Sequence, residues 1–360
     1  YIDRDRNLLY MMLPEGCESI YISVSDCPVI SLDGARNVTI DGLKISRNFG
    51  SGIVGRSCSD IVITNCEICD LCCRGIELEG CRNRVAGCHI HGIWQTSVHI
   101  TGGDRPSLTR SDSVVEDCDI YDYGKIIATY RAGVFADGCG MTVRHNHIHH
   151  APHMALYYGG NEHLFEFNEV DSVLLETADA GALYTGRDLG SKGTVVRYNY
   201  FHDIPAHEDD KIFTKGIYLD DNDSGEVVEW NILRNVPRAL MLGGGRDNII
   251  RNNLVIDCTI GFYMDARGVD RFDEPGWNLL SKLKANHYRE SPWRERYPHL
   301  AGITEEQPEL PLHDVHEGNV YVGCGDYFRY NPNLSPYLNL VNASDNIVVD
   351  FENNPRLRHR

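Results

Sequence analysis

The sequence predicts an all-β fold, a single-stranded right-handed parallel β-helix with an amino-terminal cap and a short helical insertion. Three observations predict it. A six-residue segment recurs every 22 to 32 residues, a second strand-like segment follows each copy, and no helical periodicity lies between them. Two strand signals per repeat without a helix are typical of a β-solenoid, and we expect about nine or ten coils.

The first recurring segment has an apolar residue at its first and sixth positions and cysteine or asparagine at its fourth. Coils of a solenoid stack about 4.8 Å apart, so asparagines at one position can bond to each other along the stack. This pairing explains a polar residue in a buried column, and cysteine replaces it where the stack begins. The fourth-position residues are Cys66, Cys88, Cys118, Asn146, Asn168, Asn199, Asn231 and Asn253.

The second segment alternates between apolar and outward-facing residues, as in a strand with one buried face. A leucine-rich repeat needs a recurrent leucine frame and a propeller needs four strands per repeat, and the sequence has neither. We expect the inward residues to be Leu156, Leu183, Ile217, Leu240 and Phe262. The outward residues on the same coils are then Tyr157, Tyr184, Tyr218, Met241 and Tyr263.

The repeat divides the chain into four predicted parts. Residues 1–37 form a cap that closes the stack, 38–267 form the coils, and 315–360 form the carboxy-terminal coils and cap. Residues 268–314 interrupt the repeat with two short helical patterns bracketed by prolines. We expect this partly helical insertion to form one wall of a binding site, the alternative being simple packing.

Composition limits the possible partners. The 360 residues carry a formal net charge of −18, which excludes a typical nucleic-acid-binding protein. No apolar run is long enough to span a membrane, and the opening YIDRDRNLLY suggests an excised domain or a mature fragment. We expect a soluble protein, either cytoplasmic or secreted or periplasmic with its signal removed, whose oligomeric state stays open. Most of the 13 cysteines are expected to be free and buried.

The outward tyrosines are candidates for sugar binding. Tyr157, Tyr184, Tyr218 and Tyr263 would present flat faces and hydroxyls on neighbouring coils, with small residues on both sides making room for a sugar ring. Exposed aromatic residues on a rigid scaffold favour this function. The alternative is an aromatic stack that only rigidifies the sheet.

Charged residues crowd the ends of the same strands. Two separated carboxyl groups facing a sugar groove suit glycoside hydrolysis. Asp179 lies between Ala178 and Ala180, and these apolar neighbours would favour an acid role. Other candidates for substrate contact are His150, His153, Glu176, Arg187, Asp221 and Asp265.

Metal ligands are also present in the sequence, but we expect no metal site and no cofactor. His145, His147 and His149 alternate and could bind a metal, yet they would lie on the outside of an ordinary strand. The turn DDNDSG, residues 220–225, could hold calcium, although a polar turn after a strand is the commoner meaning. Cys69, Cys72 and Cys73 lack the second cysteine pair of a zinc ribbon.

Several motifs resemble a known family. The order HNHIHH…YYGG, DAGALYTGRD with GTVVRYNYFHDI, and GIYLDDNDSG is similar to the parallel β-helix glycosidases of glycoside hydrolase family 141. That family includes α-L-fucosidase and xylanase activities with two catalytic aspartates. The resemblance implies Asp179 and Asp220 as the catalytic pair, and a fucoside- or xylan-like polysaccharide or oligosaccharide of plant or host type as substrate.

The positions of the two aspartates raise a geometric question. Asp179 precedes its strand and Asp220 ends the next one, whereas carboxyl pairs of glycosidases lie about 5–9.5 Å apart. The chain over residues 176–181 must therefore curl back over the tyrosines, as Gly181 would permit. Otherwise Asp221 or Glu176 takes part instead. We favour inversion, and which aspartate is the acid stays open.

Two other functions remain open. A polysaccharide lyase on the same fold would use Lys215 or Arg187 as base, with DDNDSG binding calcium and an acidic polymer as substrate. A non-catalytic carbohydrate-binding solenoid would cleave nothing. The acidic net charge and the neutral tyrosines favour the hydrolase over the lyase.

Overall fold

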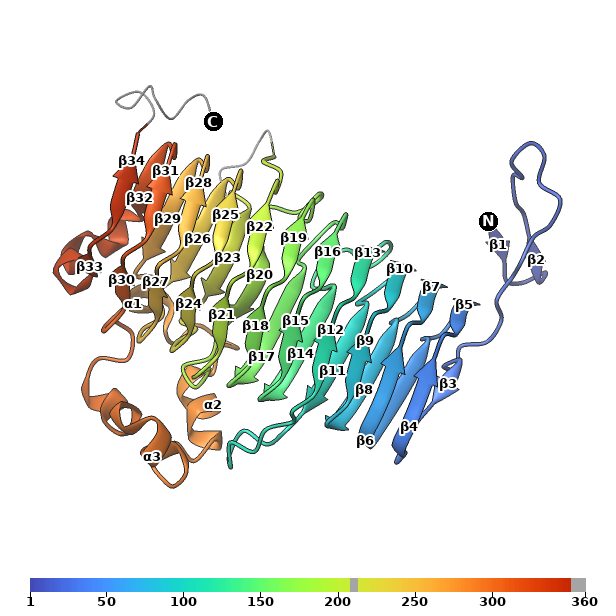
Figure 1. Ribbon diagram of the computed structural model, residues 1–360, viewed down its shortest axis with the longest axis horizontal. Helices are drawn as coiled ribbons and strands as arrows, with labels where there is room; N and C mark the ends of the chain where they lie inside the picture. The colour runs from blue at the N-terminus through green and yellow to red at the C-terminus, as the bar shows by residue number, and fades with distance from the viewer. Residues whose placement is uncertain (208–212, 351–360) are drawn as a thin grey trace.

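The computed structural model describes residues 1–207 and 213–350. Strands stack coil upon coil into one elongated solenoid, along which the chain runs from end to end (Figure 1). Adjacent strands of the stack are parallel, and the described helices are few and short. The predicted all-β parallel β-helix with a short helical insertion is confirmed. Residues 351–360 of the predicted carboxy-terminal part lie outside the described residues.

One face of the solenoid is an 11-stranded parallel sheet. It contains one strand more than the upper estimate of ten coils. Its strands are β5 (Lys44–Asn48), β7 (Glu67–Leu71), β10 (His89–Ile93), β13 (Asp119–Tyr123), β16 (His147–His149), β19 (Glu169–Asp171), β22 (Tyr200–His202), β25 (Ile232–Arg234), β28 (Leu254–Ile256), β31 (Val320–Val322) and β34 (Ile347–Val349).

The remaining strands of the stack form a 21-stranded sheet that bends into two strips, because β6 (Ile53–Thr64) extends through both. The long strip contains β3 (Ile30–Ser31), β8 (Ile76–Cys81), β11 (Val98–Gly102), β14 (Val134–Cys139), β17 (Leu156–Asn161), β20 (Gly181–Gly186), β23 (Lys215–Asp220), β26 (Arg238–Gly243), β29 (Ile260–Asp265) and β32 (Asp326–Tyr330). The short strip contains β4 (Arg36–Asp41), β9 (Arg84–Ala86), β12 (Val114–Glu116), β15 (Thr142–Arg144), β18 (Leu164–Glu166), β21 (Val195–Arg197), β24 (Val227–Glu229), β27 (Ile249–Arg251), β30 (Val315–Glu317) and β33 (Asn342–Ser344).

A typical coil therefore has three strands, and the prediction of two was wrong. The recurring six-residue segment bends at its third residue, which has a left-handed φ of 55° at His145, 57° at Tyr198 and 56° at Trp230. A single residue in this region turns the backbone sharply, so the flanking residues enter different sheets. His145 consequently lies at a bend, stacked on Phe167, and not on one face with His147 and His149.

The predicted asparagine ladder is confirmed. The Nδ2 of Asn146 donates to Oδ1 of Asn168 at 3.0 Å, and Asn168 donates to Asn199 at 2.9 Å. The ladder begins at Asn146, directly after Cys118, the last cysteine in this column. The backbone N–H of Cys118 donates to Oδ1 of Asn146 at 3.0 Å. It continues at 2.9–3.0 Å through Asn231, Asn253, Asn319 and Asn346.

Apolar side chains fill the space inside the coils. The predicted inward residues Leu156, Leu183, Ile217, Leu240 and Phe262 are all at most 1% exposed and belong to one continuous core. Each such side chain contributes about 1.5–3 kcal/mol through burial. Seven of the 13 cysteines are buried and all 13 are free thiols, as predicted.

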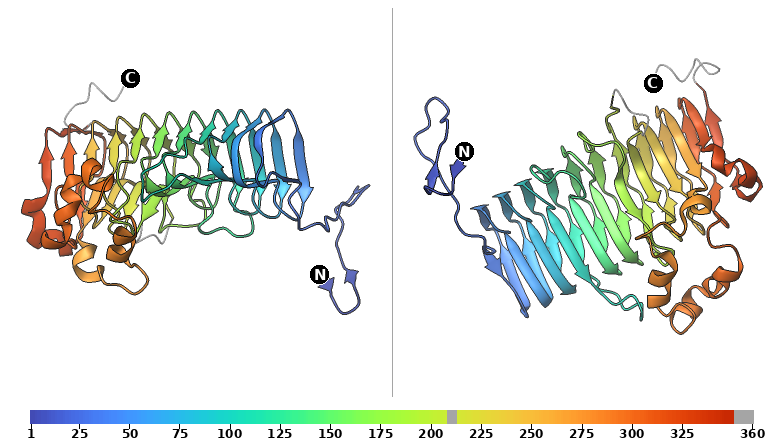
Figure 2. Two further views of the ribbon diagram at one scale, coloured as in Figure 1. Left: turned by 90° about the horizontal axis from the view of Figure 1, so that it is seen from below. Right: turned by 180° about the vertical axis from the view of Figure 1, so that it is seen from behind.

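Residues 1–37, the predicted cap, contact the first coil only in their later part, where the Gly50 N–H donates to the Ser25 carbonyl at 3.2 Å and the Val29 N–H to the Ser51 carbonyl at 3.1 Å. A small hairpin of β1 (Ile2–Asp3) and β2 (Leu8–Leu9) stands clear of the first coil (Figure 2). Many apolar side chains of this segment are exposed, and Met12 and Val24 are at least 90% exposed. Ile30 packs against the core while partly buried, and Leu32 is the first buried residue of the segment in the core.

The insertion follows β29 and contains α1 (Arg267–Arg271), α2 (Leu279–Ala285), α3 (Trp293–Arg296) and the 3₁₀ helix η1 (Pro298–Glu305), while a second 3₁₀ helix, η2 (Pro332–Leu340), follows β32. The insertion packs beside the solenoid (Figure 1). It has its own apolar cluster, which includes Trp277, Leu283 and Trp293. The Trp293 indole N–H donates to the carbonyl of Arg105 at 2.8 Å and ties the insertion to an earlier coil. No helix of the described residues is long and apolar enough to cross a bilayer.

Candidate functional site

A cavity of about 410 Å³ opens on the outer side of the long strip, where β23, β26 and β29 lie side by side. It contains four of the residues predicted from sequence, Asp179, Tyr218, Tyr263 and Asp265. Its other lining residues are Lys215, Arg238, Met241, Arg267, Asp270, Arg271, Asn331 and Asn333. Four lining residues are cationic, namely Lys215, Arg238, Arg267 and Arg271. The cavity is therefore more basic than the chain as a whole, whose net charge is −18.

The outward tyrosines pair across coils as predicted, but they are more buried than expected. Tyr157 lies opposite Tyr184, Tyr184 opposite Tyr218, and Met241 joins Tyr218 to Tyr263. They form an apolar cluster outside the coil core. Tyr184 and Tyr218 are only 7% and 2% exposed, so the prediction of open sugar-stacking faces was wrong for both.

The physical reason lies in the side chains that cover the rings. Lys215 Nζ lies 4.7 Å and Arg267 Cζ 5.9 Å from the Tyr218 ring centroid. Ala132 and Met154, from the segments before β14 and β17, pack on the same cluster. Half-buried Tyr157 and Tyr263 remain accessible in part.

Asp179 lies at the rim of the cavity. Its side chain is 68% exposed, and Oδ1 accepts a hydrogen bond from Lys215 Nζ at 3.0 Å. The apolar enclosure expected from Ala178 and Ala180 is therefore absent. The chain does turn back over the outer face before β20, as predicted. Glycine is needed at position 181 because the backbone lies close to β23, where an added Cβ would be 2.7 Å from the Cβ of Tyr218.

Asp220, the last residue of β23, is not a lining residue of the cavity, but it bonds to Arg267, which is. Its Oδ2 accepts from the Tyr184 hydroxyl at 2.9 Å, and its Oδ1 accepts from Arg267 Nη1. Burial raises the pKa of Asp220 to about 6, against the opposing attraction of Arg267. A carboxyl group with this pKa can hold or release a proton near neutral pH.

Arg267 is the organising cation that the sequence did not single out. Its Nε and Nη2 bind Asp265 at 2.9 and 2.6 Å. Its Nη1 reaches the Tyr218 hydroxyl and Asp221 Oδ1, both at 3.1 Å, in addition to Asp220. The only sequence signal was its place two residues after Asp265, at a strand end next to the DDNDSG turn.

Arg238 is a second cation that sequence reasoning missed. Its side chain is nearly buried, with Cζ 3.9 Å from the ring centroid of Tyr263. Among the described residues no carboxylate pairs with it, and its Nε has no hydrogen-bond partner. Burial lowers the pKa of Arg238 from its ordinary value. The cavity therefore has an unneutralised positive charge in its wall.

Seven predicted contact residues do not line the cavity: Tyr157 and Tyr184, described above, and five others. Glu176 is exposed nearby, whereas His150 lies against His149 on the 11-stranded side. Buried His153 bonds through Nδ1 to the Thr177 hydroxyl at 2.6 Å, and burial lowers the pKa of His153 to about 4. The remaining two form an ion pair, between Arg187 Nε and Asp221 Oδ2 at 2.7 Å.

The turn at residues 220–225 folds inward instead of facing solvent. Asp223 is fully buried, and burial next to Glu226 raises the pKa of both carboxyl groups. The Lys192 side chain lies beside this carboxyl pair. It packs against Gly225, where an added Cβ would lie 2.9 Å from Lys192 Nζ. A buried carboxyl pair that retains a proton beside an ammonium group differs from an open calcium loop, which coordinates through ionised oxygens.

The insertion contributes only its first helix to the site. Asp270 and Arg271 of α1 line the cavity, and Asn331 and Asn333 enter from the next coil. The later helices pack on loops outside the cavity. The insertion is therefore partly a wall and mainly a packing element.

Comparison with known families identifies the repeat. A family model described as "Right handed beta helix region" matches residues 20–120 and 132–272. The chain belongs to this right-handed β-helix family. The predicted handedness of the β-helix protein is thereby confirmed. Comparison with curated proteins found no match.

Among solved structures, the β-helix protein is similar to one described as a glycoside hydrolase, at 14% identity and a TM-score of 0.44, covering 68% of this chain and 41% of that one. A GH136 lacto-N-biosidase from Eubacterium ramulus matches at 12% identity and a TM-score of 0.44, covering 83% and 51%. An alginate lyase from Paenibacillus sp. str. FPU-7 matches at 12% identity and a TM-score of 0.35, covering 88% and 80%. The β-helix protein thus spans about half or less of the first two chains, and at these identities the likeness concerns the fold alone.

Proposed function

We propose that this β-helix protein is a glycoside hydrolase in which Asp220 is the general acid and Asp179 the carboxylate that activates water. One observation carries the proposal: a buried carboxyl group with a pKa of about 6 bonds to Arg267 in the wall of a cavity, and the exposed side chain of Asp179 lines the same cavity. Two carboxyl groups in such different surroundings suit the two roles of a glycosidase pair. The resemblance to family 141 agrees with the same pair.

The reaction follows from these roles. Asp220 gives its proton to the glycosidic oxygen as the bond from that oxygen to the anomeric carbon breaks. Asp179 takes a proton from water, whose oxygen bonds to the anomeric carbon from the opposite face, so the configuration inverts. Lys215 Nζ donates to Oδ1 of Asp179 at 3.0 Å and so helps to fix the position of this side chain.

Protonation of Asp220 changes one of the hydrogen bonds that its two oxygens accept, either at Oδ2 from the Tyr184 hydroxyl or at Oδ1 from Arg267. The proposed route is release of Oδ1 by Arg267. Its bidentate contact with Asp265 does not involve Asp220 and would keep the guanidinium in place. A substrate hydroxyl or the glycosidic oxygen could then replace Nη1 at Asp220. We expect the loaded site to differ from the present structure mainly at this contact.

A product screen tests the reaction class. The protein should release reducing sugar from fucosides, xylans or related oligosaccharides, without a rise in absorbance from unsaturated sugars. Aryl glycosides and plant polysaccharides are the substrates, and circular dichroism shows that the protein is folded in each assay. A folded protein that releases nothing from any of them would count against the hydrolase.

The pH profile gives a second prediction. A general acid must be protonated, and Asp220 loses its proton as the pH rises through about 6. We therefore expect kcat/KM to fall about tenfold per pH unit well above pH 6. Asp220→Glu should displace this limb, whereas a profile that rises through pH 6–8 would contradict the assignment.

A polysaccharide lyase is the second candidate, favoured by the cations of the cavity. Burial lowers the pKa of Lys215, with Asp179 opposing, and a desolvated lysine is a possible base. Arg238 could bind a sugar carboxylate. This enzyme would act on uronates, form unsaturated products and become faster as the pH rises, which is the opposite sign to the hydrolase.

A further inference from the structure

The outer side of the 11-stranded sheet carries many metal-binding side chains. In one outward column Glu67, His89, Asp119, His147 and Glu169 lie in register on successive coils. In the adjacent column the corresponding residues are Cys69, His91, Tyr121, His149 and Asp171. This face belongs to a different sheet from the cavity.

Three of these residues converge on one point. Asp119 lies on β13, while His147 and His149 lie on the next coil, on β16. Their ligand atoms all lie within 4.8 Å of one another. Asp119 Oδ1 is 3.0 Å from His149 Nε2 and 3.8 Å from His147 Nδ1.

These distances match a metal site. Tetrahedral Zn²⁺ holds nitrogen and oxygen ligands at about 2.0–2.1 Å, which places the ligand atoms about 3.3–3.4 Å apart. The two separations from Asp119 lie on either side of that value, so shifts of less than about half an ångström would bring each of these two pairs to it. The separation between the two histidine nitrogens is at most 4.8 Å. Asp119 and His147 are 35% and 43% exposed, so an ion can reach them.

Further hydrogen bonds orient the histidine rings for this purpose. His147 Nε2 is 2.7 Å from Asp171 Oδ2, and an N–H there leaves the lone pair of Nδ1 toward Asp119. His149 Nδ1 is 2.6 Å from His150 Nδ1, and an N–H there leaves the lone pair of Nε2 toward Asp119. A carboxylate that accepts the far N–H of a ligand histidine is typical of metal centres.

We propose that Asp119, His147 and His149 bind one divalent transition-metal ion of the Zn²⁺ type, with Asp171 orienting His147. The ligands come from two neighbouring coils, so the bound ion would cross-link β13 and β16. Bound metal should therefore stabilise the folded stack. The local sequence pattern could not show this site, because Asp119 lies 28 residues before His147 in the chain.

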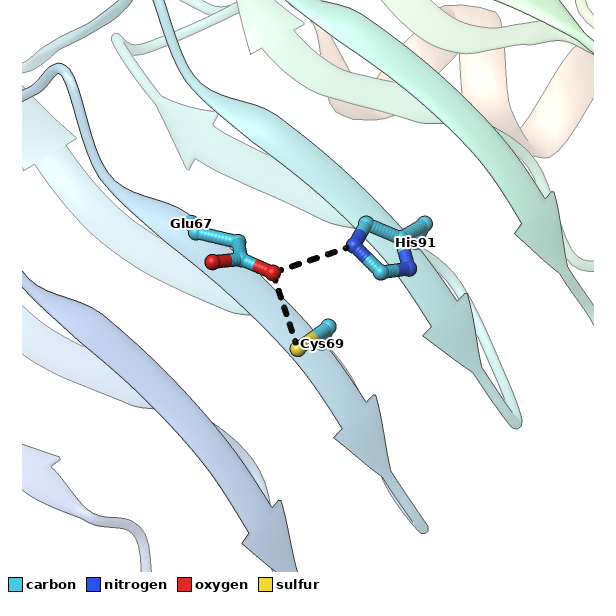
Figure 3. Close-up of side chains that lie close together, drawn as sticks. All are labelled: Glu67, Cys69 and His91. Atoms are coloured by element: carbon cyan, nitrogen blue, oxygen red, sulfur yellow. Dashed lines mark hydrogen bonds and ion pairs between the residues drawn. The ribbon is translucent and has the colours of Figure 1, made fainter.

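A neighbouring cluster provides a matched comparison. Glu67, Cys69 and His91 lie close together on β7 and β10 (Figure 3). Here Lys44 Nζ already binds Glu67 Oε1 at 2.7 Å, and burial raises the pKa of the Cys69 thiol. A cation on the carboxylate and a thiol that resists ionisation both disfavour metal binding. We therefore do not include this cluster in the proposed site.

The test is a titration of the full chain with Co²⁺ and Zn²⁺. Wild type should bind one Co²⁺ with the visible absorption of tetrahedral nitrogen and oxygen ligation, Zn²⁺ should displace it, and Zn²⁺ should raise the Tm by several degrees. The double variant His147→Gln, His149→Gln should lose the absorption and the Tm shift, while its Tm without metal stays near that of wild type.

The control is His91→Gln, which removes a histidine from the adjacent column and from the other cluster. It should keep both signals. Absence of a tetrahedral Co²⁺ spectrum in wild type would overturn the proposal, as would equal loss in His91→Gln. Should the double variant unfold, Asp119→Asn serves in its place, since it removes the shared ligand alone.

Discussion

Asp220→Asn should lower kcat by about 10²–10⁴-fold, because the variant cannot donate the proton that the leaving oxygen needs. Asparagine keeps the shape of the side chain, its Oδ1 can still accept from Arg267, and its NH2 group can donate to the Tyr184 hydroxyl, which then acts as acceptor. The Tm should therefore stay close to that of wild type. Steady-state kinetics on the best substrate of the screen give the result. An aryl glycoside with an activated leaving group should lose less activity, since it needs less protonation.

Asp137→Asn is the matched control. Asp137 is also an outward carboxyl on the long strip, and burial also raises its pKa, but it lies on β14, three strands away from β23 in the stack. Its kcat should equal that of wild type. Asp179→Asn should lose activity even with activated leaving groups. Full activity of Asp220→Asn on every substrate would remove Asp220 from the mechanism.

Asn199→Ala should lower the free energy of unfolding by about 3 kcal/mol or more. Asn199 Nδ2 donates to the Phe165 carbonyl at 3.0 Å and to Asn231 at 2.9 Å. Its Oδ1 accepts from both the side chain and the backbone N–H of Asn168. Truncation leaves these buried groups unpaired, at about 1–3 kcal/mol each where no water replaces the bond. Urea unfolding measures the loss.

Two controls separate the ladder from a general effect. Asn235→Gly removes an exposed asparagine with one side-chain bond, to Asp203, at a left-handed φ of 52° that glycine tolerates, and should change stability by less than about 1 kcal/mol. Asn199→Cys should cost less than Asn199→Ala, because the chain itself places Cys66, Cys88 and Cys118 in this column. An unchanged midpoint in Asn199→Ala would show that the ladder contributes little.

The solenoid could be predicted because its information is periodic. Each coil repeats the same apolar and asparagine positions, and stacking brings equal positions together, as the ladder from Asn146 to Asn346 shows. The third strand was missed because one left-handed residue, such as His145, divides a segment that has a continuous strand pattern. Propensity does not reveal a bend that a residue other than glycine makes.

The sequence by itself determined the fold, the inward and outward columns, and the face on which Asp179 and Asp220 lie. Only the tertiary structure decided how exposed the tyrosines are and which charges meet there. Arg267 reaches Asp220 from 47 residues away, and Asp119 meets His147 across a coil boundary. Burial and charge pairing depend on distances in space between residues remote in the chain, and a local repeat does not encode those distances.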